Sequence, residues 1–249
     1  MNIYHLVYEP SFKSLTFHHW AKCNLACLGC FCQVEKLDFS LFDDAIKRVQ
    51  TKGPETTPEK FIQSLRELDE LICGLLIERA VYIGVEPSLD PDFVQISAYM
   101  KQKYNTYNVL ITNGIKLTDM QHVDEVVFSL KAVSDDLYKY YTGHSNKQAL
   151  KNFKIIYAMG KKLQAETLFI PGLIESDEIE KIAKFIADID KNITLRIDGY
   201  FAINGQPWRS ATTAEVAYAA DIAKKYLNKV NYLTNDSSLI GEKPLRLFG

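Results

Sequence analysis

The chain has 249 residues, 47% of them hydrophobic and 12% aromatic, so it is long enough to bury a full core as one α/β domain. Its 29 Lys and Arg against 31 Asp and Glu give a formal charge of −2, with no long run of one sign. Non-specific nucleic acid is therefore not an expected partner. Neither a secretion signal over residues 1–14 nor a membrane-spanning apolar stretch is evident, so we expect a cytoplasmic protein with no membrane partner.

Six short stretches rich in β-branched and aromatic residues predict strands. Several are nearly continuous in apolar character, as in residues 80–85, which is typical of a parallel strand covered on both faces. The predicted strands are 14–20, 80–85, 108–112, 125–131, 165–170 and 194–200.

Helical spacing appears between these strands. Apolar residues repeat every three or four positions in two segments, Phe61, Leu65, Leu68, Ile72 and Leu75 in one and Ile179, Ile182, Ile186 and Ile189 in the other. Thr57 before Pro58 predicts the start of the first helix, and Ser176 before two acidic residues predicts the start of the second. Cys73 lies in the first segment, where we expect it to be buried.

Alternating strands and helices predict a partial (βα)6 TIM-like barrel, with a parallel six-stranded sheet and outer helices. We expect residues 1–249 to form a single domain with its core at about 14–227. Sites in such folds lie at the carboxyl ends of the strands. The long connection 31–57 is expected to cover that end.

Four of the five cysteines lie within ten residues, in a loop at 21–33 that follows the first predicted strand. Cys23, Cys27 and Cys30 form a C-x3-C-x2-C motif. Three thiolates hold three irons of a cubane and leave one iron open for a small molecule. A structural zinc site that includes Cys32 is an alternative, but its usual pattern is two separated C-x2-C pairs.

This motif resembles the signature of the radical S-adenosylmethionine (SAM) superfamily, and the chain is most similar to the compact glycyl-radical-enzyme activases, such as pyruvate formate-lyase activating enzyme. The resemblance implies a [4Fe-4S] cluster on Cys23, Cys27 and Cys30, with SAM chelating the open iron. It also implies reductive cleavage of SAM to a 5′-deoxyadenosyl radical that abstracts hydrogen from a substrate. An electron donor such as flavodoxin or ferredoxin is then required. The family motif gives Cys32 no role.

The ends of the second and third predicted strands carry further parts of the resemblance. Gly84-Val85-Glu86 is similar to the family's Gly-Gly-Glu stretch, with Val85 in place of the second glycine, and implies that Glu86 accepts the ammonium group of SAM. An ordinary turn is the alternative. Thr112 and Asn113 begin a Thr-Asn-Gly stretch that implies cofactor contacts.

The fourth predicted strand ends in Ser129-Leu-Lys131-Ala, which resembles the Asp-x-Lys-Ala of the activases. The resemblance implies that Lys131 points toward SAM or substrate, as the candidate catalytic residue. Ser129 replaces the aspartate, so it is a cofactor-binding candidate without an acidic role.

Two later positions complete the cofactor-binding candidates. Pro171 lies in a segment that resembles the one shaping the adenine and ribose pocket, although an ordinary strand-to-helix turn explains it as well. Arg196 is expected to clamp the SAM carboxylate, with a surface salt bridge as the alternative.

Two features of the cysteine loop and its preceding strand remain open. Gly29 stands where the family usually has an aromatic residue, and Phe31 is a candidate to fill that space. His18 and His19 either face the substrate or are structural.

Three functions remain open from the sequence. The first is an activase-like enzyme that removes hydrogen from a glycine of a protein substrate. The second is a radical SAM enzyme that acts on a small biosynthetic intermediate. The third, from another class, is a non-catalytic iron–sulfur electron carrier or metal-stabilised binding protein.

Overall fold

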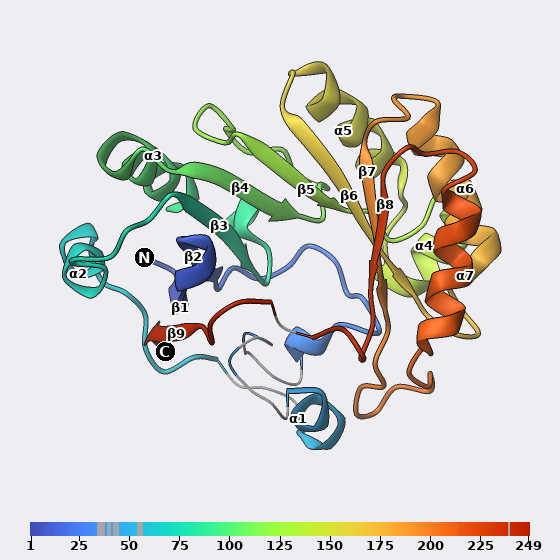
Figure 1. Ribbon diagram of the computed structural model, residues 1–249, viewed down its shortest axis with the longest axis horizontal. Coiled ribbons are helices and arrows are strands. Elements are labelled where there is room, and N and C mark those ends of the chain that lie inside the picture. Colours follow the sequence, from blue (N-terminus) through green and yellow to red (C-terminus); the bar gives the residue numbers. More distant parts are fainter. Residues whose placement is uncertain (34–37, 39–40, 42–44, 54–56, 239) are drawn as a thin grey trace.

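The computed structural model describes residues 1–33, 38, 41, 45–53, 57–238 and 240–249. Its central feature is a curled nine-stranded sheet with the order β8-β7-β6-β5-β4-β3-β2-β1-β9 (Figure 1). Strands β2 to β8 run parallel, whereas β1 is antiparallel to both β2 and β9. The strands are β1 Ile3–Glu9, β2 Ser14–His19, β3 Arg79–Gly84, β4 Tyr107–Thr112, β5 Glu125–Ser129, β6 Lys162–Phe169, β7 Thr194–Gly199, β8 Val230–Leu233 and β9 Leu245–Phe248.

The six predicted strands are confirmed as β2 to β7, and the partial barrel is correct. The sheet nevertheless has nine strands where six were predicted. Ile3–Glu9 is buried along almost its whole length and extends the sheet past β2, although it precedes the first predicted βα unit. The other two added strands, β8 and β9, have four residues each and are largely exposed, so they lack the apolar pattern of an inner strand.

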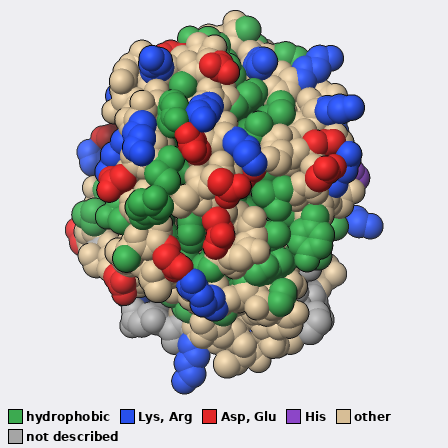
Figure 2. Space-filling model, turned by 90° about the vertical axis from the view of Figure 1, so that its right-hand side faces the viewer, with side chains coloured by type: hydrophobic (Ala, Val, Ile, Leu, Met, Phe, Trp, Pro, Cys, Tyr) green, Lys and Arg blue, Asp and Glu red, His purple; other side chains and the backbone are tan. Residues whose placement is uncertain are grey.

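Most of the helices cover the outer face of the sheet (Figure 1). The α-helices are α1 Ala45–Thr51, α2 Leu65–Leu71, α3 Phe93–Tyr104, α4 Asp135–Thr142, α5 Lys147–Ala158, α6 Ser176–Ala187 and α7 Thr213–Ala223. The first, α1, lies instead on the open, inner side of the sheet (Figure 1). On the face over α6 and α7, acidic and basic side chains are mixed, and no patch of one sign dominates (Figure 2). None of the described helices is long and apolar enough to span a membrane.

Helix α6 begins at Ser176 as predicted, but the predicted start of the first helix at Thr57 and Pro58 is wrong. Helix α2 begins only at Leu65, because Ser64 caps it by accepting a hydrogen bond from the Glu67 amide at 3.2 Å. Just before it, the Ile62 amide donates to the Ile3 carbonyl at 3.0 Å, which ties that part of the chain to β1.

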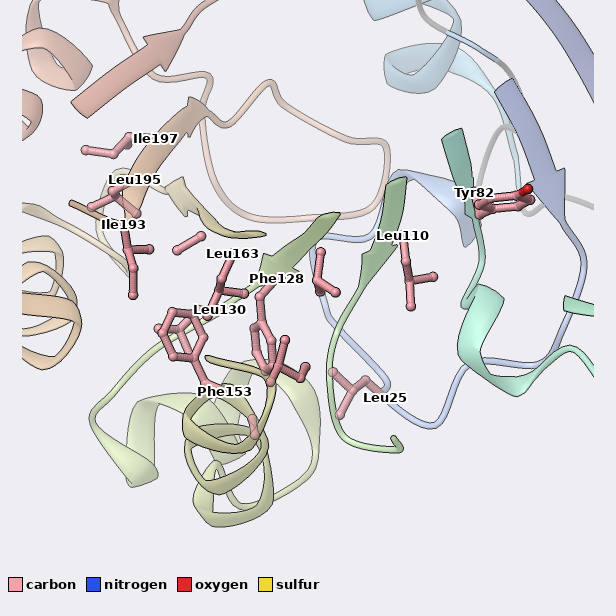
Figure 3. Close-up of a cluster of buried hydrophobic side chains, with 14 of the residues drawn as sticks. Leu25, Tyr82, Leu110, Phe128, Leu130, Phe153, Leu163, Ile193, Leu195 and Ile197 are labelled. Carbon is pink, nitrogen blue, oxygen red and sulfur yellow. The ribbon is translucent and has the colours of Figure 1, made fainter. Parts of the chain in front are cut away.

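The hydrophobic core lies between the sheet and its outer helices (Figure 3). Tyr82, Leu110 and Phe128 project from neighbouring strands and are fully buried, and Phe153 of α5 packs against Phe128 at 5.1 Å between ring centroids. The prediction that Cys73 is buried is wrong: it lies in the turn after α2 and is exposed. The shorter helix ends before it reaches that position.

The inner face of the sheet lines a cavity of about 1230 Å³. Side chains at alternate positions of β2, β3 and β7 reach it, among them His18, Ile83 and Arg196. Phe31, Cys32 and residues of α1, all from the connection 31–57, also line this cavity. Within that segment, 34–37, 39–40, 42–44 and 54–56 lie outside the described residues.

Candidate functional site

The cysteine loop follows β2 at the carboxyl end of the barrel and is anchored on both sides. Leu25 is 8% exposed and joins the hydrophobic core (Figure 3). The amides of Ala26 and Leu28 each donate at 2.9 Å to carbonyls at the end of α4, those of Thr142 and Tyr141 respectively. The loop therefore presents its thiols from a backbone that core packing and α4 hold in place.

Cys23, Cys27 and Cys30 are all partly buried on this loop. Burial raises the pKa of Cys27 to about 12 and also raises the pKa of Cys23. Buried thiols become stable thiolates when a metal supplies positive charge, so this donor set fits an iron–sulfur cluster. Within the described ranges, no group of three or more His, Cys, Asp or Glu side chains is arranged to hold a single metal ion.

Cys32 differs from the three motif cysteines in its surroundings. It lines the inner cavity, and its thiol hydrogen-bonds with Cys30. That hydrogen bond and burial raise the pKa of Cys32 well above the usual value. Cys32 therefore lies close to the motif on the cavity side.

Gly84 lies where β3 approaches β2 most closely. Its φ is +123°, and a Cβ at this position would lie 2.4 Å from the His19 carbonyl oxygen. Only glycine accommodates both the conformation and the contact. This close approach brings the end of β3 beside the start of the cysteine loop.

Glu86 is 2% exposed, and the protein itself provides hydrogen bonds to both of its carboxylate oxygens. Its Oε1 accepts from the hydroxyls of Thr112 and Ser88, each at 2.6 Å, and from the Ser88 amide at 3.1 Å. Its Oε2 accepts from the Asn113 amide at 2.9 Å. The carboxylate is thereby held in one orientation, and Oε2 retains capacity for a further donor.

Asn113 connects this carboxylate to the cysteine loop. Its side-chain amide donates to the Asn24 oxygen at 2.8 Å and to the Cys23 sulfur at 3.4 Å. The predicted residues Glu86, Thr112 and Asn113 thus form one network that reaches a motif cysteine. We call this network the carboxylate clamp.

A second polar group spans β5, β6 and β7 on the inner face. Arg196 is bidentate to Asp198, at 2.9 and 3.0 Å, and also donates to Glu166 at 2.6 Å. The Ser129 hydroxyl donates to Glu166 as well. Two carboxylates therefore occupy the guanidinium of Arg196, so a salt bridge forms here, on the cavity side of the sheet. We call Ser129, Glu166, Arg196 and Asp198 the charged strip.

Lys131 lies next to this strip, just after β5. Within the described part of the chain it has neither a hydrogen bond nor an ion pair. Its ammonium opposes the burial that raises the pKa values of Cys27 and Asp198, so it lies near both. The strip is half-buried, and its two carboxylates balance the charges of Arg196 and Lys131, but within the described residues the Lys131 ammonium keeps its hydrogen-bonding capacity for a ligand.

Sequence reasoning missed several residues of the site. Glu166 alternates with Gln164 on β6, where Gln164 precedes the predicted start at 165, and that alternation of polar residues was the available signal. At Gly29, a Cβ would lie 3.0 Å from both the Tyr141 hydroxyl and the Tyr200 ring, so these tyrosines fill the space left by the missing aromatic residue. Phe31 packs instead on Phe201, with ring centroids 6.1 Å apart.

The two histidines of β2 have different roles. His19 is fully buried on the outer face and pairs with Asp90 at 2.7 Å, a structural contact. His18 lines the cavity and contacts Asp38 at 3.2 Å. Pro171 is buried in a short turn closed by the Ile170 amide and the Ile174 carbonyl, at 2.8 Å.

Comparisons with known proteins agree with this geometry. A protein of Methanocaldococcus jannaschii, named as a glycyl-radical enzyme activating enzyme, is 32% identical over 182 residues, covering 66% of this chain and 69% of that protein. A pyruvate formate-lyase-activating enzyme of Streptococcus mutans is 28% identical over 91 residues, covering 36% of this chain and 35% of that protein.

Solved structures share the fold. SuiB of Streptococcus suis bound to S-adenosylmethionine has a TM-score of 0.61 at 14% identity, covering 86% of this chain and 48% of that chain. The sequence pattern described as the Radical SAM superfamily matches residues 17–186. That span runs from β2 through α6 and includes the cysteine loop, the carboxylate clamp and Lys131. This chain therefore belongs to the radical SAM superfamily.

Proposed function

We propose that Cys23, Cys27 and Cys30 bind the [4Fe-4S] cluster of this radical SAM enzyme and that SAM occupies the open iron. The cysteine loop supports this assignment, because it follows β2 and carries the three partly buried thiols. When bound and reduced, the cluster supplies the electron that cleaves SAM to a 5′-deoxyadenosyl radical, which abstracts hydrogen from the substrate.

The protein's own groups would then position SAM. Within the described residues Lys131 has no hydrogen bond or ion pair, and it acts on the pKa of Cys27, so we assign it to the SAM carboxylate. Glu86 is assigned to the ammonium group through Oε2, because its Oε1 already accepts three hydrogen bonds. Lys131 and Glu86 thus complement the opposite charges of the amino-acid part of SAM.

The other predicted cofactor-binding residues have supporting roles in this proposal. Gly84 brings β3 against β2, and Thr112 and Asn113 orient Glu86 and Cys23. Ser129, with Glu166, offers polar atoms to the ribose, and Pro171 shapes the turn beside it. Arg196 orients Glu166 and Asp198 rather than clamping the SAM carboxylate.

For the substrate we propose a glycine of a protein, as in an activase. The names of the M. jannaschii and S. mutans relatives support this class. A structure of SuiB bound to its precursor peptide shares the fold, with a TM-score of 0.59. A small biosynthetic intermediate is the second candidate, favoured by the cavity of about 1230 Å³.

The proposal extends to the domain organisation, location and electron donor of the protein. We propose that residues 1–249 act as a single radical SAM domain in the cytoplasm, with a flavodoxin or ferredoxin as electron donor. The nine-stranded sheet, which includes residues near both ends of the printed chain, supports the single domain.

The test of the chemistry is anaerobic. The cluster is reconstituted and reduced with dithionite, SAM is added, and 5′-deoxyadenosine and methionine are measured by mass spectrometry. Each of Cys23→Ala, Cys27→Ala and Cys30→Ala should lose cluster and product together, whereas Cys32→Ala and the exposed control Cys73→Ala should keep both. Loss of the cluster in Cys32→Ala would overturn the ligand assignment.

A further inference from the structure

Tyr138 on α4 carries a buried hydroxyl without a hydrogen-bond partner in the described part of the chain. The whole residue is 0% exposed. Buried polar groups in native proteins are nearly always hydrogen-bonded, so this hydroxyl needs a partner, a water or a bound group, that the described protein groups do not supply.

The position of Tyr138 indicates what that partner is. Its own carbonyl accepts from the Thr142 hydroxyl at 2.7 Å, and the last turn of α4 holds the cysteine loop through the carbonyls of Tyr141 and Thr142. Burial and, after it, charge on Cys27, Cys23 and Glu86 raise the pKa of the Tyr138 phenol, so its hydroxyl is on the side of α4 that faces the cysteine loop and Glu86.

Protein acceptors near this hydroxyl already have other partners. Glu86 accepts from Thr112, Ser88 and Asn113, and Tyr138 is absent from its hydrogen bonds. The motif thiols also lie beyond hydrogen-bond contact of Tyr138 in the described structure. A cubane held by those thiols would add sulfur atoms beside the cysteine side chains, and these are acceptors that the protein alone does not provide.

We propose that the Tyr138 hydroxyl donates a hydrogen bond to a sulfur atom of the [4Fe-4S] cluster and thereby raises the reduction potential of the cluster. The inference rests on the proposed ligands Cys23, Cys27 and Cys30. Reduction adds negative charge to the cluster, so a donor to sulfur stabilises the reduced form more than the oxidised form. Tyr138 therefore tunes the electron-transfer step without taking part in hydrogen abstraction.

The test is Tyr138→Phe, which removes only the hydroxyl, with Tyr157→Phe as the matched control. Tyr157 is exposed on α5 and hydrogen-bonds to Asp190 at 3.2 Å. An EPR-monitored redox titration of the reconstituted proteins should show a lower midpoint potential in Tyr138→Phe alone. At a fixed solution potential we expect roughly a tenfold lower ratio of reduced to oxidised cluster, equivalent to about 59 mV for one electron.

A second readout follows the proton itself. In wild-type protein exchanged into D2O, ENDOR of the reduced cluster should detect an exchangeable deuteron that Tyr138→Phe lacks and Tyr157→Phe retains. An unchanged midpoint potential and an unchanged ENDOR signal in a fully loaded Tyr138→Phe protein would overturn the inference while leaving the proposed function intact.

The melting temperature of the metal-free protein distinguishes this role from a structural one. Because the hydroxyl has no partner there, Tyr138→Phe should leave the melting temperature of the metal-free protein unchanged or higher. A lower melting temperature would show that the hydroxyl has a protein or water partner and would also count against the inference. If no cluster forms in any variant or in wild type, the proposed ligand set fails, which is a different result.

Discussion

The carboxylate clamp, at the ends of β3 and β4, and the charged strip, across β5, β6 and β7, satisfy their polar groups differently. In the clamp, Glu86 is buried and the protein supplies a donor to each of its oxygens. The charged strip lies beside Lys131, whose ammonium has no partner within the described residues. The comparison indicates that the carboxylate clamp fixes the cysteine loop. The charged strip instead has the Lys131 ammonium beside it, which we propose binds a ligand.

The largest effect is expected for Gly84→Ala, at the position two residues before Glu86 where β3 contacts the backbone of β2. The new Cβ would lie 2.4 Å from the His19 carbonyl oxygen at a φ of +123°, so strain and overpacking combine. We expect the free energy of unfolding to fall by about 3–5 kcal/mol, measured in urea. The control is Gly172→Ala, where φ is +79° and no atom lies within 4 Å, with an expected loss of about 1 kcal/mol. Equal losses in both variants would contradict the close-approach argument.

Glu86→Ala tests the clamp itself. It leaves the buried Thr112 hydroxyl and the Asn113 amide without their acceptor, so the metal-free protein should lose about 3 kcal/mol of unfolding free energy. Glu166→Ala is the counterpart in the charged strip. There Arg196 keeps its bidentate contact with Asp198, so the loss should be about 1 kcal/mol. A larger loss in Glu166→Ala would reverse the comparison.

Lys131→Ala should affect binding rather than folding. Because its ammonium has no hydrogen bond or ion pair to lose among the described residues, urea unfolding should be unchanged. The dissociation constant for SAM, measured on protein with equal iron content, should rise roughly 10- to 100-fold, which is the value of one charge-assisted hydrogen bond. Lys139→Ala, which removes an exposed lysine paired with Asp135, serves as control. Unchanged SAM affinity would refute the assignment of Lys131 to the carboxylate.

The smallest effect is expected for Asn113→Ala. Its side-chain bonds to Asn24 and the Cys23 sulfur are lost, while its backbone bond to Glu86 remains. We expect a loss of about 1 kcal/mol and faster hydrogen exchange in the cysteine loop of the metal-free protein. Exchange at wild-type rates would show that core packing and α4 hold the loop without Asn113.

The sequence was informative where one segment carried both structure and chemistry. The inner strands are apolar enough to be read directly, and the C-x3-C-x2-C motif lies on one loop after the first of them. The helix prediction at Thr57 failed because apolar spacing alone does not show that Ile62 contacts β1 before Ser64 starts the helix.

Residues that act through tertiary contacts could not be predicted. Tyr141 and Tyr200 meet at Gly29 from two distant segments, and no local pattern links them to it. Glu166 joins Ser129 and Arg196 because β5, β6 and β7 are neighbours in register, which a single strand does not reveal.

We propose that Cys23, Cys27 and Cys30 hold a cluster whose fourth iron is open to SAM. The EPR spectrum of the reduced cluster, recorded with and without SAM in wild type and in Cys32→Ala, tests this proposal. If Cys32 is not a ligand, SAM should change the spectrum in both proteins. A wild-type spectrum that SAM leaves unchanged would refute the proposal, as would a cluster that requires Cys32.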